Sequence, residues 1–170
     1  MVPAHDGEEI PMNLYFKKNG FKMNRKNRVL IESYGAYGIP LTQGFNIVNM
    51  CAMERGWVLA QAMVRGGGDC GVQWHEKGKL LNKHNSFSDL ISCTEYLVAN
   101  RISHTNLIAA TGSSAGGTLV AQTCLNMRPD LYKAVVLEVP FLDIVSCLLD
   151  DTLPLSLTDH LEFGNPKLDS

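Results

Sequence analysis

A serine set among small residues, between an apolar run and a helix-like segment, limits the fold of this chain more than any other feature. Residues 107–128 read LIAATGSSAGGTLVAQTCLNMR, and Pro129 follows. The apolar start predicts a short buried strand, and the part after the glycines predicts a helix that the proline ends. Between them the sequence fits G-x-S-x-G, the turn that lifts a serine hydroxyl to the carboxyl edge of a sheet.

The central serine of this motif, Ser114, has two interpretations. In the first, Ser114 is a nucleophile, and the backbone N–H of Ala115 at the helix start stabilises the negative charge that develops on an attacked carbonyl oxygen. In the second, Ser114 is only a small residue that fits a tight strand-to-helix loop. Because the motif follows a buried strand and precedes a helix, its position favours the nucleophile.

Strands and helices alternate along most of the chain. An N-terminal hairpin turns at Asp6-Gly7, and alternating apolar residues follow it as far as Phe16. The spacing of Ser86 and Asp89 resembles a capping box, which predicts that a helix starts at Ser86. Such alternation predicts an α/β fold with a mostly parallel sheet and helices on both faces. After the hairpin we expect strands from Val29 and within 56–64, 106–112 and 133–140, and helices within 47–53, 87–98 and 116–128.

The composition is that of one globular domain and excludes several classes of function. The chain has 170 residues, of which 45% are hydrophobic and 19% charged, and this is enough to bury a core. A formal net charge of -2 provides no basic surface for nucleic acid. No apolar run approaches the ~20 residues of a membrane span. We therefore treat residues 1–170 as one domain and expect neither a nucleic-acid nor a membrane partner.

The cysteines give no sign of a metal site or a disulfide framework. Their number is odd, they are widely spread, and none forms a CxxC pair. We expect them to act as small apolar residues in a reducing compartment, which predicts a cytoplasmic location, with an organelle entered through a transit peptide as the alternative. We expect no metal and no organic cofactor. The five are Cys51, Cys70, Cys93, Cys124 and Cys147.

Several segments outside the serine motif, taken together, resemble one enzyme family. They are SYGAYG, RGGGDCGVQWHEKGKLLNKHNSFSDL, GSSAGG, NMRPDLYKAVVLEVPFLDI and LPLSLTDHLEFGNP, and they occur in this order within residues 2–166. These segments are similar to the catalytic domain of the prolyl oligopeptidase family of serine peptidases, and most like its oligopeptidase B and prolyl endopeptidase-like branch. The resemblance implies an α/β-hydrolase fold and the cleavage of short peptides.

The resemblance also implies roles for three residues. Ser114 matches the nucleophile, Ala115 the residue whose N–H forms half of the oxyanion hole, and Tyr34 the tyrosine whose hydroxyl forms the other half. A phenol O–H at the end of a neighbouring strand is able to donate to a tetrahedral oxygen. An ordinary aromatic residue at the end of a strand is the alternative for Tyr34.

In the segment TDHLEFGNP, the resemblance implies acidic residues that pair with a basic P1 side chain of the substrate. Asp159 occupies one acidic position, Leu161 stands where the second acid is expected, and Glu162 lies alongside. We therefore expect Asp159 and Glu162 to bind substrate. A helix N-cap is the alternative for Asp159. The departure at Leu161 argues against a strict preference for Arg or Lys.

A catalytic serine also needs an acid and a base. In this fold the acid and the base follow the serine, and His160 is the only histidine after Ser114. We expect the acid, the base and the family's β-propeller to lie outside residues 1–170, which makes this chain a partial catalytic domain with little activity alone. Arg65, Trp74 and His75 resemble structural residues of a loop near the active site.

These observations predict a serine peptidase that cleaves short peptides through an acyl-enzyme on Ser114. Two rivals stay open. One is an esterase or thioesterase that uses the same turn, and the other is a hydrolase-fold interaction module without a triad. The segments outside the serine motif favour the peptidase.

Overall fold

A five-stranded sheet forms the centre of the protein in the computed structural model, which describes residues 1–41 and 44–168. The strands run in the order β3-β5-β4-β6-β7. The last four of these pair in parallel, and β3 is antiparallel to β5, so the prediction of a mostly parallel sheet is confirmed. The strands are β3 (Met12–Tyr15), β4 (Arg28–Glu32), β5 (Trp57–Ala62), β6 (Ile108–Ser113) and β7 (Ala134–Glu138).

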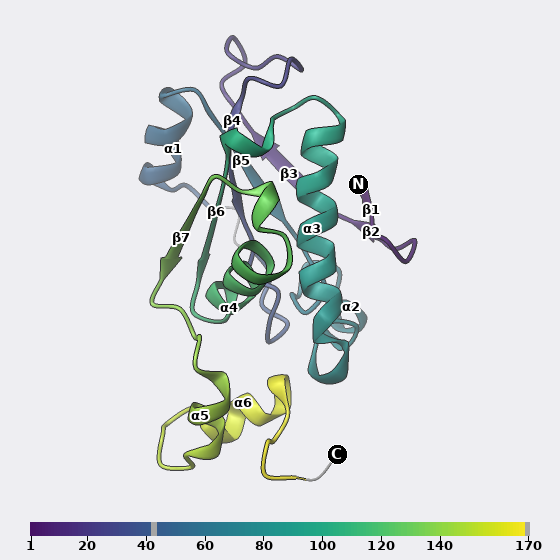
Figure 1. The fold of residues 1–170 in the computed structure, drawn as a ribbon, viewed down its shortest axis with the longest axis vertical. Coiled ribbons are helices and arrows are strands. Elements are labelled where there is room, and N and C mark those ends of the chain that lie inside the picture. Colours follow the sequence, from purple (N-terminus) through teal and green to yellow (C-terminus); the bar gives the residue numbers. More distant parts are fainter. Residues whose placement is uncertain (42–43, 169–170) are drawn as a thin grey trace.

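Helices cover the two faces of this sheet unequally (Figure 1). On one face lie α3 (Lys83–Ala99) and α4 (Ala115–Ala121), and α4 continues as a π-helix through Gln122–Met127. On the other face lies α1 (Ile47–Glu54), none of whose side chains is buried. The short α2 (Val72–Glu76) precedes α3. Beyond the carboxyl end of β7 lie α5 (Ile144–Leu149) and α6 (Ser156–Phe163).

The hydrophobic core lies between the sheet and the pair α3 and α4. Alternate residues of neighbouring strands point to the same face, and Ile31, Ala60 and Ala110 on this face are fully buried. They belong to one cluster with Leu90 of α3 and Leu119 of α4. The opposite face has no comparable cover from α1. None of the helices in the described part of the chain has the length and apolar character that a bilayer crossing requires.

The N-terminal hairpin is joined to the core through Arg65, a buried arginine. β1 (Val2–Pro3) and β2 (Glu9–Ile10) pair antiparallel, as the Asp6-Gly7 signal predicted. The guanidinium of Arg65, whose side chain is 4% exposed, donates to the carboxylate of Asp89 at 2.6 and 2.9 Å and to that of Asp6 at 2.6 Å. Arg65 thus joins the hairpin to α3, and the pairing places it in a structural position.

The predicted capping box at Ser86 and Asp89 is wrong. α3 begins at Lys83, and both residues lie inside it, fully buried. Their side chains have stronger partners elsewhere, because Asp89 holds Arg65 and the Ser86 hydroxyl donates to the carbonyl oxygen of Arg65. A pattern of short polar residues cannot distinguish a cap from such a tertiary contact.

Candidate active site

Ser114 occupies the sharp turn between β6, which ends at Ser113, and α4, which begins at Ala115. Its φ of 51° and ψ of -123° lie in a region that residues other than glycine rarely adopt. Two hydrogen bonds fix this conformation, because the carbonyl oxygen of Ser114 accepts from the N–H of Gly117 at 3.0 Å and from that of Phe141 at 2.9 Å. The residue is exposed. The turn therefore presents the Ser114 hydroxyl to solvent.

Two glycines make this turn possible by removing side chains from close contacts. A Cβ on Gly112 would lie 2.3 Å from the carbonyl oxygen of Gly116, and a Cβ on Gly116 would lie 2.8 Å from the carbonyl oxygen of Ser33. Both close atoms belong to the backbone, and the backbone cannot move aside as the end of a flexible side chain can. A side chain at either position would therefore clash. The first turn of α4 thus packs directly against the residues that follow β4.

Tyr34 follows β4, which is the parallel neighbour of β6, so the sheet brings it to the same edge as Ser114. Its phenol is half-buried, and its pKa is raised. Burial is the largest cause, the neighbouring Ser114 hydroxyl acts in the opposite direction, and the carboxylates of Glu162 and Asp159 add to the increase. A phenol with a raised pKa keeps its proton at neutral pH and remains a hydrogen-bond donor.

Ala115 provides a second donor at this edge. As the first residue of α4, it has a backbone N–H without an acceptor within the helix. The structure therefore brings the three residues Ser114, Ala115 and Tyr34 together at the carboxyl ends of two adjacent strands. Two hydrogen-bond donors beside a serine hydroxyl are able to stabilise the oxyanion that forms when such a hydroxyl attacks a carbonyl carbon.

A buried charged cluster supports the segment that carries Tyr34. The ammonium of Lys83 donates to the carbonyl oxygen of Gly35 and to Oε1 of Glu162, both at 2.7 Å, and lies 5.1 Å from the centroid of the Phe163 ring. The other oxygen of Glu162 lies 2.7 Å from Nε2 of His75. The Glu162 side chain is 2% exposed. Each of its oxygens already has one partner, so Glu162 is held in place by His75 and Lys83.

Asp159 also faces inward, toward the segment after β4. The Tyr37 hydroxyl donates to Oδ1 of Asp159 at 2.8 Å, and the ring of Tyr37 packs edge-on against that of Phe163 with centroids 5.9 Å apart. Asp159 lies within α6, whose N-cap position is Leu155. The alternative interpretation of Asp159 as a helix N-cap is therefore wrong.

Comparison with known proteins now identifies the family, since the model of the prolyl oligopeptidase family matches residues 43–170. The chain belongs to the prolyl oligopeptidase family. It is 41% identical over 166 residues to a Rattus norvegicus protein named prolyl endopeptidase-like, and the match covers 98% of this chain and 23% of that protein. It is 40% identical over 167 residues to dipeptidyl aminopeptidase BI of Pseudoxanthomonas mexicana, again over 98% and 23% of the two proteins.

Solved structures of the prolyl oligopeptidase family share this fold. Oligopeptidase B from Trypanosoma brucei, solved with covalently bound antipain, superposes with a TM-score of 0.92 and 37% identity, over 97% of this chain and 23% of that one. The match confirms the predicted α/β-hydrolase fold. The chain thus spans about a quarter of the length of the relatives it matches.

In this member of the prolyl oligopeptidase family, the structure does not pair His160 with the serine. Nε2 of His160 lies 2.9 Å from the carbonyl oxygen of Leu148, within the contact between α5 and α6. Among residues 1–41 and 44–168, no histidine forms a hydrogen bond with Ser114. The same residues contain no cluster of three or more His, Cys, Asp or Glu side chains suited to a metal ion.

Sequence reasoning missed two residues of this site, Lys83 and Tyr37. Lys83 stands in a polar run, LNKHNS, where a lysine is usually solvated, yet its side chain is only 13% exposed. Tyr37 has a φ of 56°, a value that favours glycine, in the segment SYGAYG. The available signal for Tyr37 was a bulky residue between the glycines of a predicted turn. Such a residue needs a contact that holds it in this conformation.

Proposed function

We propose that this chain carries the nucleophile and the oxyanion hole of a serine peptidase that cleaves short peptides. The hydroxyl oxygen of Ser114 attacks the carbonyl carbon of the scissile bond while a general base takes its proton. The N–H of Ala115 and the hydroxyl of Tyr34 donate to the oxyanion. The C–N bond then breaks, the leaving amine takes the proton, and water hydrolyses the acyl-enzyme.

One observation carries this proposal: an exposed serine hydroxyl held at a φ of 51° between β6 and α4, beside the Tyr34 phenol. A strained conformation that several hydrogen bonds fix is costly, and it is typical of residues whose position has a function. A serine that merely filled space would gain nothing from exposure at this place. Membership of the prolyl oligopeptidase family supports a peptide as the acyl donor.

For substrate recognition, we propose that Asp159 and Glu162 contribute the negative charge of the P1 site. Asp159 supports this role better, because one of its oxygens accepts from Tyr37 at 2.8 Å and the other has no partner among the described residues. Glu162 is held by Lys83 and His75. A peptide with a basic P1 residue should therefore lose affinity more in Asp159→Asn than in a variant of a remote acid such as Glu9→Gln.

The experiment that tests the proposed function is labelling with a fluorophosphonate probe, applied to the product of the native gene. We expect covalent labelling that Ser114→Ala abolishes and Ser113→Ala does not. Tyr34→Phe should slow labelling by about 10²–10³-fold, the effect of losing one oxyanion donor, and Tyr96→Phe on α3 should not. A folded protein that the probe does not label would contradict the proposal and favour the interaction module.

Cleavage rates of the same gene product on peptides and on esters distinguish a peptidase from an esterase. Rates on short basic peptides and on esters of equal length should both depend on Ser114, and the peptides should be cleaved. Cleavage of esters alone would assign the esterase. We further propose a cytoplasmic location, which the five free cysteines support.

A further inference from the structure

One face of α6 contacts the segment that carries Tyr34. Asp159, Glu162 and Phe163 stand at positions i, i+3 and i+4 of this helix, which lie side by side on one face. The two acids reach the segment through polar contacts. Phe163 reaches it through its ring, which packs edge-on against the ring of Tyr37 with centroids 5.9 Å apart. α6 therefore meets the segment after β4 with an aromatic ring as well as with charge.

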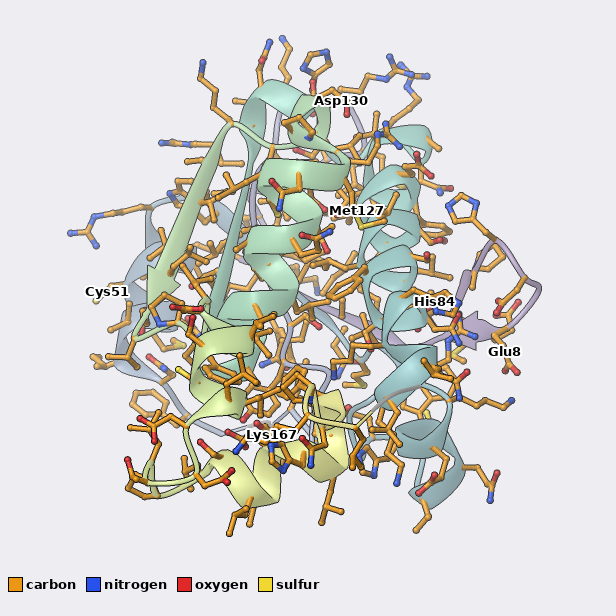
Figure 2. The ribbon with its side chains drawn as sticks, turned by 60° about the horizontal axis from the view of Figure 1, so that its bottom comes forward. Glu8, Cys51, His84, Met127, Asp130 and Lys167 are labelled. Atoms are coloured by element: carbon orange, nitrogen blue, oxygen red, sulfur yellow. The ribbon has the colours of Figure 1, made fainter. Side chains whose placement is uncertain are left out.

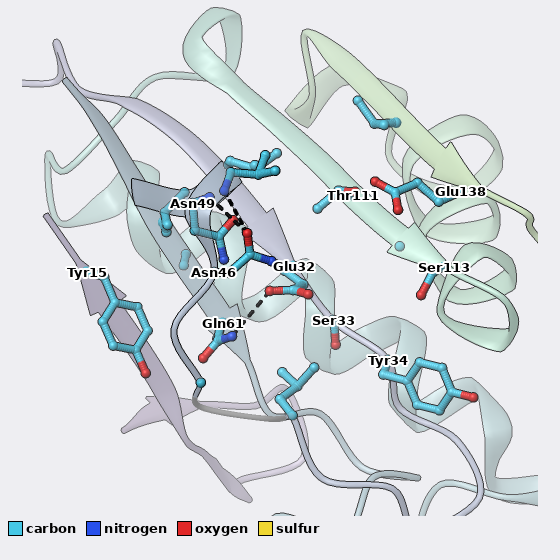
Figure 3. Close-up of a pocket in the computed structure, with 18 of the residues that line it drawn as sticks. Tyr15, Glu32, Ser33, Tyr34, Asn46, Asn49, Gln61, Thr111, Ser113 and Glu138 are labelled. Atoms are coloured by element: carbon cyan, nitrogen blue, oxygen red, sulfur yellow. Dashed lines mark hydrogen bonds between the residues drawn. The ribbon is translucent and has the colours of Figure 1, made fainter. Parts of the chain in front are cut away.

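The aromatic contact continues from Tyr37 to Tyr34. Their ring centroids lie 6.5 Å apart, with the ring planes tilted by 43°, and aromatic rings still interact at this separation. Figure 3 shows Tyr34 just beyond the end of β4, at the same edge of the sheet as Ser113, the last residue of β6. One intervening ring thus connects Phe163 to the phenol that we propose as an oxyanion donor.

The ring of Phe163 also contacts the serine turn, through Phe141. The centroids of these two rings lie 5.6 Å apart in an edge-on arrangement. The N–H of Phe141 donates to the carbonyl oxygen of Ser114 at 2.9 Å, and the carbonyl oxygen of Phe141 accepts from the hydroxyl of Thr118 on α4. Both bonds involve the backbone of Phe141, which leaves its ring to pack on Phe163. The Phe163 ring therefore lies between the serine turn and the tyrosine segment.

The strand ladder does not itself fix the position of the Tyr34 phenol. Glu32 is the last residue of β4 that pairs with a neighbouring strand, and Tyr34 lies two residues beyond it. Packing, rather than main-chain pairing, thus sets where the phenol lies relative to Ser114. Catalysis is sensitive to this position, because a misplacement of about 1 Å can cost about 10²-fold in rate.

We propose that Phe163 is a positioning residue that sets the distance between the Ser114 turn and the Tyr34 phenol. This inference rests on the proposed function, since it gives Phe163 an effect on oxyanion stabilisation. Loss of the ring leaves the serine hydroxyl and both donors present but lets the phenol move away from the oxyanion. An interaction made only in the transition state is then weakened, which lowers kcat and leaves KM unchanged.

The test measures kcat and KM of the native gene product on a short basic peptide. We expect Phe163→Leu to lower kcat about tenfold, less than the ~10²–10³-fold effect of losing a donor, with KM unchanged. Phe163→Tyr keeps the ring and should keep the kcat of the unmodified protein. The matched control is Phe16→Leu, which removes a ring stacked on Phe21 at the opposite edge of the sheet and should change neither constant.

A double-variant cycle with Tyr34→Phe distinguishes positioning from general packing. Once the hydroxyl is gone there is no donor to position, so adding Phe163→Leu should lower kcat by less than about twofold. A loss that persists in full in the Tyr34→Phe background would overturn the proposal, because the ring would then support the fold in general. A raised KM with unchanged kcat would also overturn it, because Phe163 would then bind substrate.

Phe141→Leu tests the same contact if Phe163→Leu does not fold. It removes the other ring of the pair and keeps the backbone contacts with the serine turn, so it should show the same loss of kcat and the same dependence on Tyr34. Ser114→Ala distinguishes this inference from the proposed function. Cleavage that survives in Ser114→Ala refutes the proposed function and the inference with it. Cleavage that Ser114→Ala abolishes, and that neither leucine variant slows, refutes the role of Phe163 alone.

Discussion

The ammonium of Lys83 lies 2.7 Å from both Oε1 of Glu162 and the carbonyl oxygen of Gly35, so one cation joins α6 to the residue beside Tyr34. Burial lowers the pKa of Lys83, and the bond to Glu162 opposes that shift. Burial favours the neutral amine, and the Glu162 carboxylate favours the charged ammonium.

Lys83→Met should destabilise the protein by about 3–5 kcal/mol, because it leaves the Glu162 carboxylate buried without its cation. Urea unfolding measures the loss. The double variant Lys83→Met/Glu162→Gln should recover part of it, since the unpaired charge is then gone. Lys79→Met removes a partly exposed lysine whose partner, Glu76, is exposed, and should change little. If Lys83→Met were as stable as the unmodified chain, the Lys83–Glu162 pair would make no contribution to the free energy of unfolding.

Gly116→Ala should disturb the serine turn, because the new Cβ would lie 2.8 Å from the carbonyl oxygen of Ser33 and 3.1 Å from Cα of Tyr34. We expect a loss of stability of about 1–3 kcal/mol, as for other overpacked sites, together with slower labelling of Ser114. The matched control is Gly20→Ala, where the nearest atom is 3.7 Å away. Unchanged stability and labelling in Gly116→Ala would contradict the close packing of α4 on this segment.

The ionisation of Tyr37 should depend on Asp159. Burial and the hydrogen bond to that carboxylate raise the pKa of Tyr37, because ionisation would place two negative charges side by side. The stabilisation from this bond is complete below the ordinary tyrosine pKa of about 10 and is lost as pH rises through the folded value.

Asp159→Asn should therefore lower the pKa of Tyr37. The alkaline loss of stability should still begin near the ordinary tyrosine pKa of about 10, but it should be smaller and end at a lower pH. The NMR shift of the ring carbon that bears the hydroxyl measures this ionisation, and Tyr37→Phe assigns its signal. Asp151→Asn, which changes an exposed acid paired with Lys167, is the control. A Tyr37 pKa that stays the same in Asp159→Asn would exclude the carboxylate as a cause.

The cysteines should react with iodoacetamide in a fixed order. Cys51 is exposed on α1, at the periphery of the molecule (Figure 2), and should react first. Burial raises the pKa of Cys124 to about 12 and that of Cys93 even further. Since the thiolate is the reactive form, neither should react at about pH 8 until the protein unfolds. Mass spectrometry of the native chain checks this order. Early modification of Cys93 would contradict its burial in the hydrophobic core.

The sheet and the serine turn could be predicted because their signals are local. A buried run, a glycine motif and a helix pattern occupy adjacent residues, so LIAATGSSAGG alone places Ser114 between β6 and α4. Family resemblance adds Tyr34, whose position depends on the pairing of β4 with β6. Both predictions rest on short sequence distances or on a known fold.

The surroundings of the acidic residues could not be predicted, because they depend on distant parts of the chain. Glu162 meets a lysine 79 residues away, and Asp159 meets a tyrosine 122 residues away. No periodicity in the sequence marks such pairs. The capping box predicted at Ser86 and Asp89 was wrong for the same reason. Both side chains form hydrogen bonds with Arg65, more than 20 residues away, instead of capping a helix.

The long sequence separation between α6 and the segment after β4 has a consequence for the order of folding. Contacts that close large loops form late, because the entropy of closure must be met before they contribute. The sheet should therefore assemble first, and the tyrosine beside the serine should acquire its final position only when the last helix arrives. A ribosome-bound chain that stops short of residue 156 would then have the serine turn in place while the segment that carries Tyr34 still lacks its contacts with α6.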